Sequence, residues 1–334
     1  IYIKNILSKV YKYYMKILAI QNRMGIGDTV IFLPFIKALS KKFNSPISLL
    51  VKESSKADQY LYQTNYIDKI LILERDRSNN ARHNGFFGSL NLIQDLKKCN
   101  FDKIFIFNSS LRFNLIARLS KIPDIYQYPL FSKTEQHITN VPKKFIKEKL
   151  NLDVDEDPEI QIQEQLVMDA IQNFQINNNE LNILLGIGGS GPSKRIPSKI
   201  FLEVIDKILK VKKCKFFLAT GKNNEEQVIL YEILNSKFQN FCVPLDNLSI
   251  KETLPIIKNC KLSICNDSSF SHLSAALGIK TITLMADTPL IYGNYSSKMF
   301  PIIPDGEKIV RHNTLGKEKI NPQKIFDKII EINN

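Results

Sequence analysis

Residues 16–43 read KILAIQNRMGIGDTVIFLPFIKALSKKF, and this stretch decides the fold class. The apolar run 16–21 has the length of a short buried strand. A turn with two glycines follows at residues 23–28. Residues 29–43 then carry apolar side chains at helical spacing, with Pro34 in the first turns. A strand that leads through a glycine turn into a helix is typical of α/β domains with a parallel sheet.

Strands and helices alternate along the rest of the chain. In the first half we expect strands at 47–51, 69–73 and 103–108 and a helix at 90–98. The second half repeats the pattern, with strands at 181–185, 215–219, 262–265 and 281–285 and helices at 199–210, 250–258, 269–277 and 322–332. The alternation predicts an α/β protein of two Rossmann-like, doubly wound parallel-sheet domains that face each other across a cleft.

A polar stretch separates the two predicted domains, which we place at 16–160 and 161–320. A final helix within 321–334 could pack back on the first domain. The boundary contains the acidic run 153–157, which includes two Asp-x-Asp spellings. Carboxylates in this arrangement can ligate a metal ion. Because no apolar strand precedes them, we interpret the run as a solvated linker and predict no metal site.

The chain of 334 residues is basic, with a formal net charge of +13. This charge favours an anionic partner, such as a phosphorylated substrate, an acidic membrane surface or nucleic acid. A general lysine-rich composition is the alternative, because lysines occur along the whole sequence. We see no RNA-binding signature and no confined basic helix, and therefore expect no nucleic-acid partner. Five unpaired-looking cysteines indicate a reducing compartment rather than a disulfide framework.

No apolar run reaches the roughly 18 residues that cross a bilayer. Residues 1–15 form a basic, aromatic, amphipathic extension without the cleavage site of a signal peptide. The extension could lie on an anionic membrane face or pack on the first domain. We therefore expect a cytoplasmic protein with a possible peripheral contact at the inner membrane.

The first motif that could take part in catalysis or binding is the turn after the first strand. Gly25 and Gly27 allow the backbone to approach a ligand closely. Asp28 could accept a proton from an attacking hydroxyl at the mouth of the cleft. It could equally cap the following helix, because aspartate is a preferred capping residue.

The second motif is the glycine-rich segment 186–197, which reads GIGGSGPSKRIP. It satisfies the Gly-x-Gly-x-x-Gly spelling of dinucleotide-binding domains. However, its two prolines move the start of the next helix away from the glycines, and no acidic residue stands at the end of the following strand. A glycine loop next to Lys194 and Arg195 suits a diphosphate better than NAD, since backbone amides and cations can neutralise its charge.

Two more motifs follow strands of the second half. In CNDSSFSH, residues 265–272, a strand ends and a helix begins with Asp267, Ser268 and Ser269, so free amides could bind phosphate there. His272 is either packed in the helix or part of the site. In GKNNEE, residues 221–226, Glu225 could hold a ribose hydroxyl or serve as a first-turn helix acid.

Taken together, the four motifs resemble glycosyltransferase family 9, the ADP-heptose:lipopolysaccharide heptosyltransferases, over roughly residues 16–333. The matching positions are Arg23 to Asp28, then Lys194, Arg195 and Pro197, then Gly221 and Glu225, and finally Asp267, Ser268, Ser269, His272, Ser274, Ala275 and Ala276. Ser269 departs from the glycine of many members.

The resemblance implies a GT-B fold and an inverting sugar transfer that needs no metal and no cofactor. The donor would be ADP-heptose, and the acceptor an anionic, lipid-linked glycan of the bacterial lipopolysaccharide core. Asp28 would be the general base, and Lys194 would stabilise the leaving diphosphate. The implied donor-binding residues are Gly188, Gly189, Ser190, Arg195, Glu225, Asp267, Ser268, Ser269 and His272. The implied acceptor-binding residues are Gly25, Gly27, Arg75, Arg77 and Arg112.

Other functions remain open at this stage. The same fold could use another nucleotide sugar in capsule or O-chain synthesis, because no motif identifies the sugar. A nucleic-acid-binding or nucleotide-binding protein without enzymatic activity is a more distant alternative. A dehydrogenase is the remaining enzyme class, given the glycine spelling at 186–191.

Overall fold

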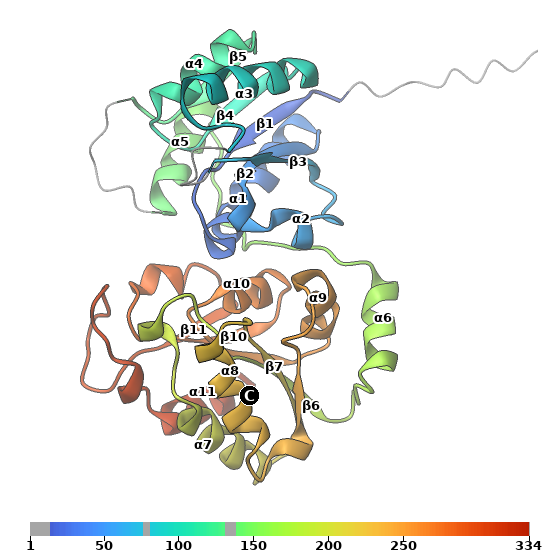
Figure 1. The fold of residues 1–334 in the computed structure, drawn as a ribbon, viewed down its shortest axis with the longest axis vertical. Coiled ribbons are helices and arrows are strands. Elements are labelled where there is room, and N and C mark those ends of the chain that lie inside the picture. The colour runs from blue at the N-terminus through green and yellow to red at the C-terminus, as the bar shows by residue number, and fades with distance from the viewer. Residues whose placement is uncertain (1–13, 76–80, 131–137, 334) are drawn as a thin grey trace, which may run out of the picture.

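A computed structural model describes residues 14–75, 81–130 and 138–333 of the chain, which form two α/β domains (Figure 1). Nearly all of the predicted N-terminal extension and residue 77 lie outside these ranges. Within the described part, no helix is both long and apolar enough to cross a membrane.

The first domain is built on a five-stranded parallel sheet of order β3-β2-β1-β4-β5. Its strands are β1 (Ile17–Ile20), β2 (Ile47–Lys52), β3 (Ile67–Leu73), β4 (Lys103–Ile106) and β5 (Asp124–Gln127). Its helices are α1 (Ile26–Phe43), α2 (Ala57–Tyr60), α3 (Gly85–Cys99), α4 (Leu111–Leu119) and α5 (Asn140–Leu150). Apolar side chains of α3 and α4 pack on one face of this sheet, and those of α1 and α5 on the other.

The second domain is built on a six-stranded parallel sheet of order β11-β10-β9-β6-β7-β8. Its strands are β6 (Leu181–Gly186), β7 (Cys214–Ala219), β8 (Cys242–Pro244), β9 (Leu262–Asn266), β10 (Lys280–Leu284) and β11 (Met299–Ile302). The helices after the linker are α6 (Glu164–Asn173), α7 (Ser198–Leu209), α8 (Asn224–Leu234), α9 (Ile250–Lys258), α10 (Ser269–Ala276) and α11 (Pro322–Asn333). The predicted pair of parallel-sheet domains is confirmed.

Helix α1 begins three residues earlier than the sequence pattern predicts. Its N-cap is Gly25, whose extended backbone leads directly out of the turn, and it ends at Asn44 in the left-handed conformation. Pro34 therefore lies in the interior of the helix rather than in its first turns. It cannot donate a hydrogen bond to the carbonyl of Val30, and the surrounding core compensates, because all residues from Thr29 to Ile36 are buried.

The acidic run at the domain boundary is paired with lysines, and its residues Asp153, Asp155 and Glu156 stay exposed, as a solvated linker predicts. Glu159 accepts a hydrogen bond from Lys37 of α1 at 2.5 Å, and Glu156 pairs with both Lys37 and Lys41. On the other side, Asp157 accepts a hydrogen bond from the backbone N–H of Ser297 at 2.8 Å. The linker therefore ties helix α1 of the first domain to a loop of the second domain.

The expectation that the C-terminal helix packs back on the first domain is wrong. Helix α11 packs against α7 and against strands β10 and β11 of its own domain. Its apolar residues Ile325, Ile329 and Ile332 join the buried cluster of the second sheet. The helix has one apolar stripe, and this stripe is already packed against the sheet of the second domain.

Replacing Lys37 with methionine should weaken the anchoring of the linker. Hydrogen bonds from Lys37 and from Lys41 lower the pKa of Glu159 and Glu156, respectively. A lowered carboxylate pKa stabilises the fold above the unfolded-state pKa, and this contribution disappears as the pH falls through the folded-state pKa. Both carboxylates are partly exposed, so we expect Lys37→Met to cost only about 0.5–1 kcal/mol at pH 7.

Urea unfolding at pH 7 and at about pH 3 measures this effect. The difference between wild type and Lys37→Met should shrink at the lower pH. Lys144→Met is the matched control, because Lys144 makes only an exposed pair with Glu148 on the same helix. An equal loss in both variants, or a loss independent of pH, would contradict the role given to Lys37.

Candidate functional site

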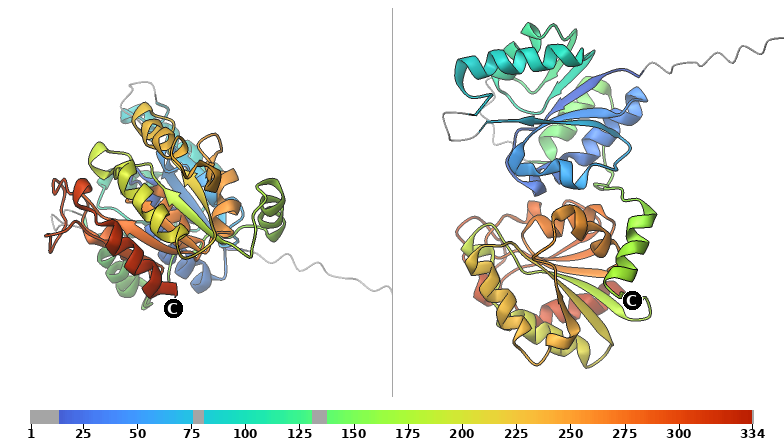
Figure 2. Two further views of the ribbon diagram at one scale, coloured as in Figure 1. Left: turned by 90° about the horizontal axis from the view of Figure 1, so that it is seen from below. Right: turned by 45° about the vertical axis from the view of Figure 1, so that its right-hand side comes forward.

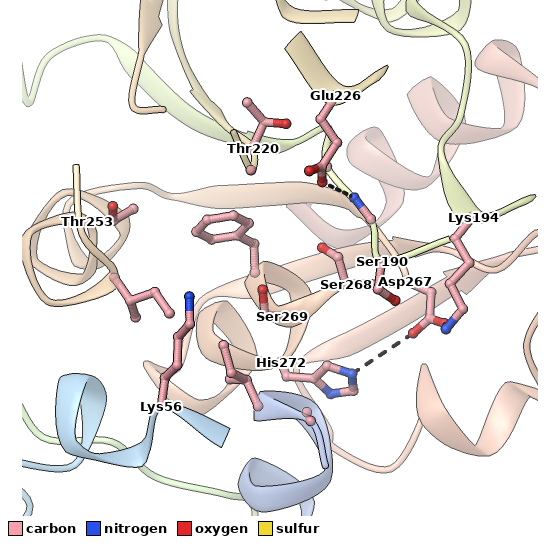
Figure 3. A pocket seen from close by; sticks show the side chains of 18 of the residues that line it. Lys56, Ser190, Lys194, Thr220, Glu226, Thr253, Asp267, Ser268, Ser269 and His272 are labelled. Atoms are coloured by element: carbon pink, nitrogen blue, oxygen red, sulfur yellow. Dashed lines mark hydrogen bonds and ion pairs between the residues drawn. The ribbon is translucent and has the colours of Figure 1, made fainter. Parts of the chain in front are cut away.

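A cleft of about 1000 Å³ lies between the two domains. In parallel α/β sheets this is the edge where the carboxyl ends of the strands meet. From the first domain the cleft is lined by Gly25, Ile26, Gly27, Asp28, Ser54, Lys56 and Gln59. The second domain contributes the glycine loop, the segments 220–226 and 246–253, and the start of α10 (Figure 3).

Asp28 lines this cleft and also caps its own helix, and its role as a proton acceptor stays a prediction. Its Oδ2 atom accepts a hydrogen bond from the backbone N–H of Gly25 at 3.0 Å. Its Oδ1 atom lies 3.9 Å from the guanidinium of Arg23. The carboxylate is therefore oriented at one oxygen by the turn and lies at the other oxygen near the charge of Arg23.

Gly27 lies where helix α1 of the first domain packs on helix α10 of the second domain. A Cβ atom built at this position would lie 2.5 Å from the imidazole of His272, which belongs to α10 of the second domain. No real Cβ atom tolerates such a distance to a ring held in place. The missing side chain at residue 27 therefore allows the start of α1 to pack on α10 and brings Asp28 up to the second domain.

A buried polar array lies behind this contact. The ammonium group of Lys194 donates to Asp267 Oδ2 at 2.6 Å, and His272 Nε2 lies 3.9 Å from Asp267 Oδ1 (Figure 3). On the other side of the ring, His272 Nδ1 lies 2.8 Å from the hydroxyl of Tyr295. Asp267 and His272 are both nearly inaccessible to solvent.

His272 is neutral in this environment. Burial lowers its pKa, and the positive charge of Lys194 acts in the same direction, while Asp267 and Asp28 oppose the shift. Burial raises the pKa of the Tyr295 hydroxyl well above its usual value, so that hydroxyl keeps its proton. A protonated hydroxyl next to a neutral imidazole can donate to Nδ1, which favours the tautomer with its hydrogen on Nε2, toward Asp267.

The glycine loop is held by Glu226 rather than by Glu225. Glu226 is buried, and its Oε1 atom accepts a hydrogen bond from the backbone N–H of Gly189 at 2.7 Å. Cβ atoms at Gly188 and Gly221 would collide with its carboxylate, at 2.5 Å and 2.2 Å. These two glycines are therefore needed because the chain closes tightly around one acidic side chain.

Two predicted donor-binding residues lie outside the cleft lining. Glu225 is exposed and forms an ion pair with Arg195. Arg195 also donates to the carbonyl of Gly189 at 2.9 Å, so it supports the glycine loop from behind. The loop residues Gly188, Gly189 and Ser190 do line the cleft, as do Ser268 and Ser269. Glu226 lines the cleft and Glu225 does not, and the donor role of Glu225 stays a prediction.

Several hydroxyl groups in the cleft wall have unused hydrogen-bonding capacity. The buried side-chain oxygens of Thr220, Ser268 and Thr288 have no partner among the described residues. Ser268 is also the N-cap of α10, where the first backbone amides of the helix have no partner within it. Because buried polar groups are normally satisfied, these hydroxyls are able to bind a polar group that enters the cleft.

The predicted acceptor-binding arginines do not line the cleft where the structure describes them. Arg75 is exposed just beyond β3. Arg112, at the start of α4, donates to the hydroxyl of Ser89 at 2.9 Å and to the carbonyl of His83 at 2.6 Å. Burial and the charge of Arg75 lower the pKa of Arg112, so the two cations lie near each other. Arg77 lies outside the described residues, and the acceptor role of all three stays a prediction.

The cleft is also lined by residues outside the four motifs, namely Lys56, Gln59 and residues of the segment 246–253. Lys56 and the segment follow strands β2 and β8 closely, and the carboxyl ends of those strands face the same edge as the motifs. Topology alone was therefore a usable signal for these residues. Within the described part of the chain, no group of three or more His, Cys, Asp and Glu residues is arranged to hold a metal ion.

Gly27→Ala should destabilise the contact between the domains. The added methyl group would overlap the ring of His272, and overpacking of this kind costs about 1–3 kcal/mol. Gly191→Ala is the matched control, because a Cβ atom there meets nothing within 4 Å and its φ of −133° suits any residue. Urea unfolding should show a loss for the first variant and a change within about 0.5 kcal/mol for the second. Equal stability of both variants would contradict the close packing at Gly27.

Comparisons with known proteins agree with this architecture. The model of the family "Glycosyltransferase family 9 (heptosyltransferase)" matches residues 89–329. Lipopolysaccharide heptosyltransferase 1 of Campylobacter coli is 24% identical over 340 residues, which cover 91% of this chain and 93% of that protein.

Solved structures show the same fold. A family 9 glycosyltransferase from Veillonella parvula superposes with a TM-score of 0.74 at 17% identity, covering 96% of this chain and 97% of that one. The Escherichia coli heptosyltransferase WaaC with ADP gives a TM-score of 0.69 at 13% identity, covering 96% and 100%. The two parallel-sheet domains thus form a GT-B fold. Because the family model spans well over half of the residues, the chain belongs to glycosyltransferase family 9 and is a glycosyltransferase.

Proposed function

We propose that this glycosyltransferase moves a heptose from ADP-heptose to a lipopolysaccharide core or similar surface glycan, with inversion and without a metal ion. The observation that carries the proposal is the placement of Asp28 on one wall of the cleft, with Lys194, Asp267 and the start of α10 on the other. The similarity to a lipopolysaccharide heptosyltransferase and to a heptosyltransferase structure with ADP supports the choice of sugar and nucleotide.

The reaction would be a direct displacement at the anomeric carbon. Asp28 accepts the proton of the acceptor hydroxyl while the oxygen of that hydroxyl forms the new bond to the anomeric carbon. On the opposite face, the bond to the diphosphate oxygen breaks, and its electron pair leaves with ADP. Inversion follows because the nucleophile enters opposite to the leaving group.

The second domain would stabilise the charge that develops on the diphosphate. Lys194 is a cation within reach, and the free amides at Ser268 and Ser269 begin a helix whose dipole favours anions. When Lys194 turns toward the diphosphate, Asp267 becomes free to accept hydrogen bonds from the sugar hydroxyls. Glu226 would position the glycine loop against the nucleotide, because its carboxylate accepts a hydrogen bond from the backbone N–H of Gly189.

The first domain would bind the acceptor. Arg23 and Lys56 lie near or in the cleft, and Arg75 and Arg112 lie farther along the same domain. Together with the chain's positive charge, they suit an anionic, lipid-linked glycan. Such an acceptor would place the enzyme in the cytoplasm, at the inner face of the membrane where the glycan is assembled.

Asp28→Asn tests the proposed base. The amide keeps the size of the side chain but cannot take a proton, so kcat should fall by on the order of 10²–10⁴-fold. Binding of ADP, measured by calorimetry, should change little, because the nucleotide contacts come from the second domain. Transfer at the wild-type rate would reject Asp28 as the base.

A thermal-shift panel of ADP-, UDP- and GDP-sugars tests the donor. At about 100-fold excess over its dissociation constant, the true donor should stabilise the protein by about 2.7 kcal/mol. We expect this stabilisation with ADP-heptose, a smaller one in Glu226→Gln and an undiminished one in the matched variant Glu225→Gln. Selective stabilisation by a UDP- or GDP-sugar would contradict the proposed nucleotide.

A further inference from the structure

The outer face of α3 and α4 exposes an unusual amount of apolar surface. Phe86 and Phe87 are 74% and 78% exposed, the highest values among the large hydrophobic residues that the structure describes. Leu90 continues this surface along α3. Leu111, Leu115 and Leu119 follow at helical spacing on α4 and are all at least 49% exposed. We call these six residues the α3/α4 face.

This face is separate from the core that the two helices share. Their inner residues, such as Leu92, Leu96, Phe113 and Ile116, are buried against the first sheet. The two helices also contact each other, and Arg112 of α4 bridges to Ser89 of α3. The outer stripe is therefore a second apolar surface on helices that already have a packed side.

The position of the helices leaves the face open. Both lie at the end of the molecule that is remote from the second domain (Figures 1 and 2). Closure of the cleft cannot cover them, because it acts on the opposite side of the first domain. Among the described residues, therefore, the second domain supplies no cover for this face.

Cations border the α3/α4 face. Lys97 and Lys98 at the end of α3 and Arg118 and Lys121 at the end of α4 are exposed. The one acid of the two helices is Asp95, which is bound by Arg82, contacts His83 and lies 4.0 Å from the ammonium of Lys98. An apolar centre with a cationic border matches a bilayer that contains anionic lipids, where apolar side chains enter the headgroup boundary and cations meet lipid phosphates.

The face is also connected to the acceptor side of the site. Helices α3 and α4 begin after the carboxyl ends of β3 and β4, at the sheet edge that faces the cleft. Phe86, Phe87 and Leu111 therefore lie in the first turn of each helix. A glycan whose lipid stays in the bilayer could extend past Arg112 toward Asp28.

We propose that the α3/α4 face docks the protein on an anionic bilayer, with Phe86 and Phe87 entering the headgroup boundary. The choice of a bilayer as the partner rests on the proposed function. The residues that would contact the membrane lie outside the N-terminal extension 1–15.

Flotation with vesicles of phosphatidylcholine, with and without phosphatidylglycerol, tests the docking in the absence of donor and acceptor. The full chain should bind the anionic vesicles. The triple variant Phe86→Ser, Phe87→Ser, Leu115→Ser should bind at least about tenfold more weakly, since three apolar side chains leave the boundary. The matched control is Val228→Ser with Tyr231→Ser on α8, which are 54% and 58% exposed on the second domain and should leave binding unchanged.

A charge variant separates the two components of the binding. Lys97→Gln, Lys98→Gln and Lys121→Gln together should weaken binding to the anionic vesicles, and raised salt should reproduce that loss in the wild type. Thermal melting of each variant checks that it is folded, and exposed substitutions of this kind should shift it little.

Three results would overturn the proposal. The full chain could fail to bind anionic vesicles. Deletion of residues 1–13 could abolish binding while the triple variant binds normally. The triple variant could instead abolish a concentration-dependent dimer, which would give the face to a second copy of the chain. Sugar transfer by Asp28→Asn is a separate readout. A failure of vesicle binding would reject the docking proposal and leave the role of Asp28 untouched. Transfer by Asp28→Asn at the wild-type rate would reject the proposed base, even if the protein binds vesicles as expected.

Discussion

The site depends on one steric constraint, the contact between the backbone of Gly27 and the ring of His272. A side chain at residue 27 would overlap that ring. Its absence allows the first turn of α1 to lie against α10, and the next residue, Asp28, then reaches the wall formed by the second domain. Two sheets that share no strand are thereby placed so that a carboxylate of one faces the cation and helix start of the other.

The same contact contributes to the burial of His272 in the polar array of the second domain. His272 is shielded by α1 on one side and held by Tyr295 on the other, so it stays neutral, and the charges in the array are those of Lys194 and Asp267. Their ion pair holds both groups in place before the substrate binds. A diphosphate can then replace Asp267 as the partner of the Lys194 ammonium, and the carboxylate can accept hydrogen bonds from another partner. The linker limits how far the domains can separate, because Glu159 holds to α1 and Asp157 to the loop at Ser297.

Local patterns predicted the fold well, and long-range contacts account for what they missed. Apolar runs and helical spacing were sufficient for two parallel-sheet domains, since central strands such as β1 and β9 are buried on both faces. The position of Asp28 followed from the turn that precedes it. By contrast, the choice between Glu225 and Glu226 depends on how Asn223 caps α8, accepting a hydrogen bond from the Glu226 backbone and donating to its side chain. The pairing of the acidic run with Lys37 and the bond between His272 and Tyr295 join residues far apart in the chain, for which a single sequence contains no signal.

The account is tested most directly by a crystal structure of the protein with a non-reacting nucleotide sugar and an acceptor fragment. It predicts diphosphate oxygens within hydrogen-bonding distance of Lys194 and of the amides at Ser268 and Ser269. It also predicts the Asp28 carboxylate about 2.6–3.2 Å from the acceptor hydroxyl, on the opposite face of the anomeric carbon. A diphosphate bound away from the start of α10, or an Asp28 carboxylate separated from the hydroxyl by protein atoms, would contradict it.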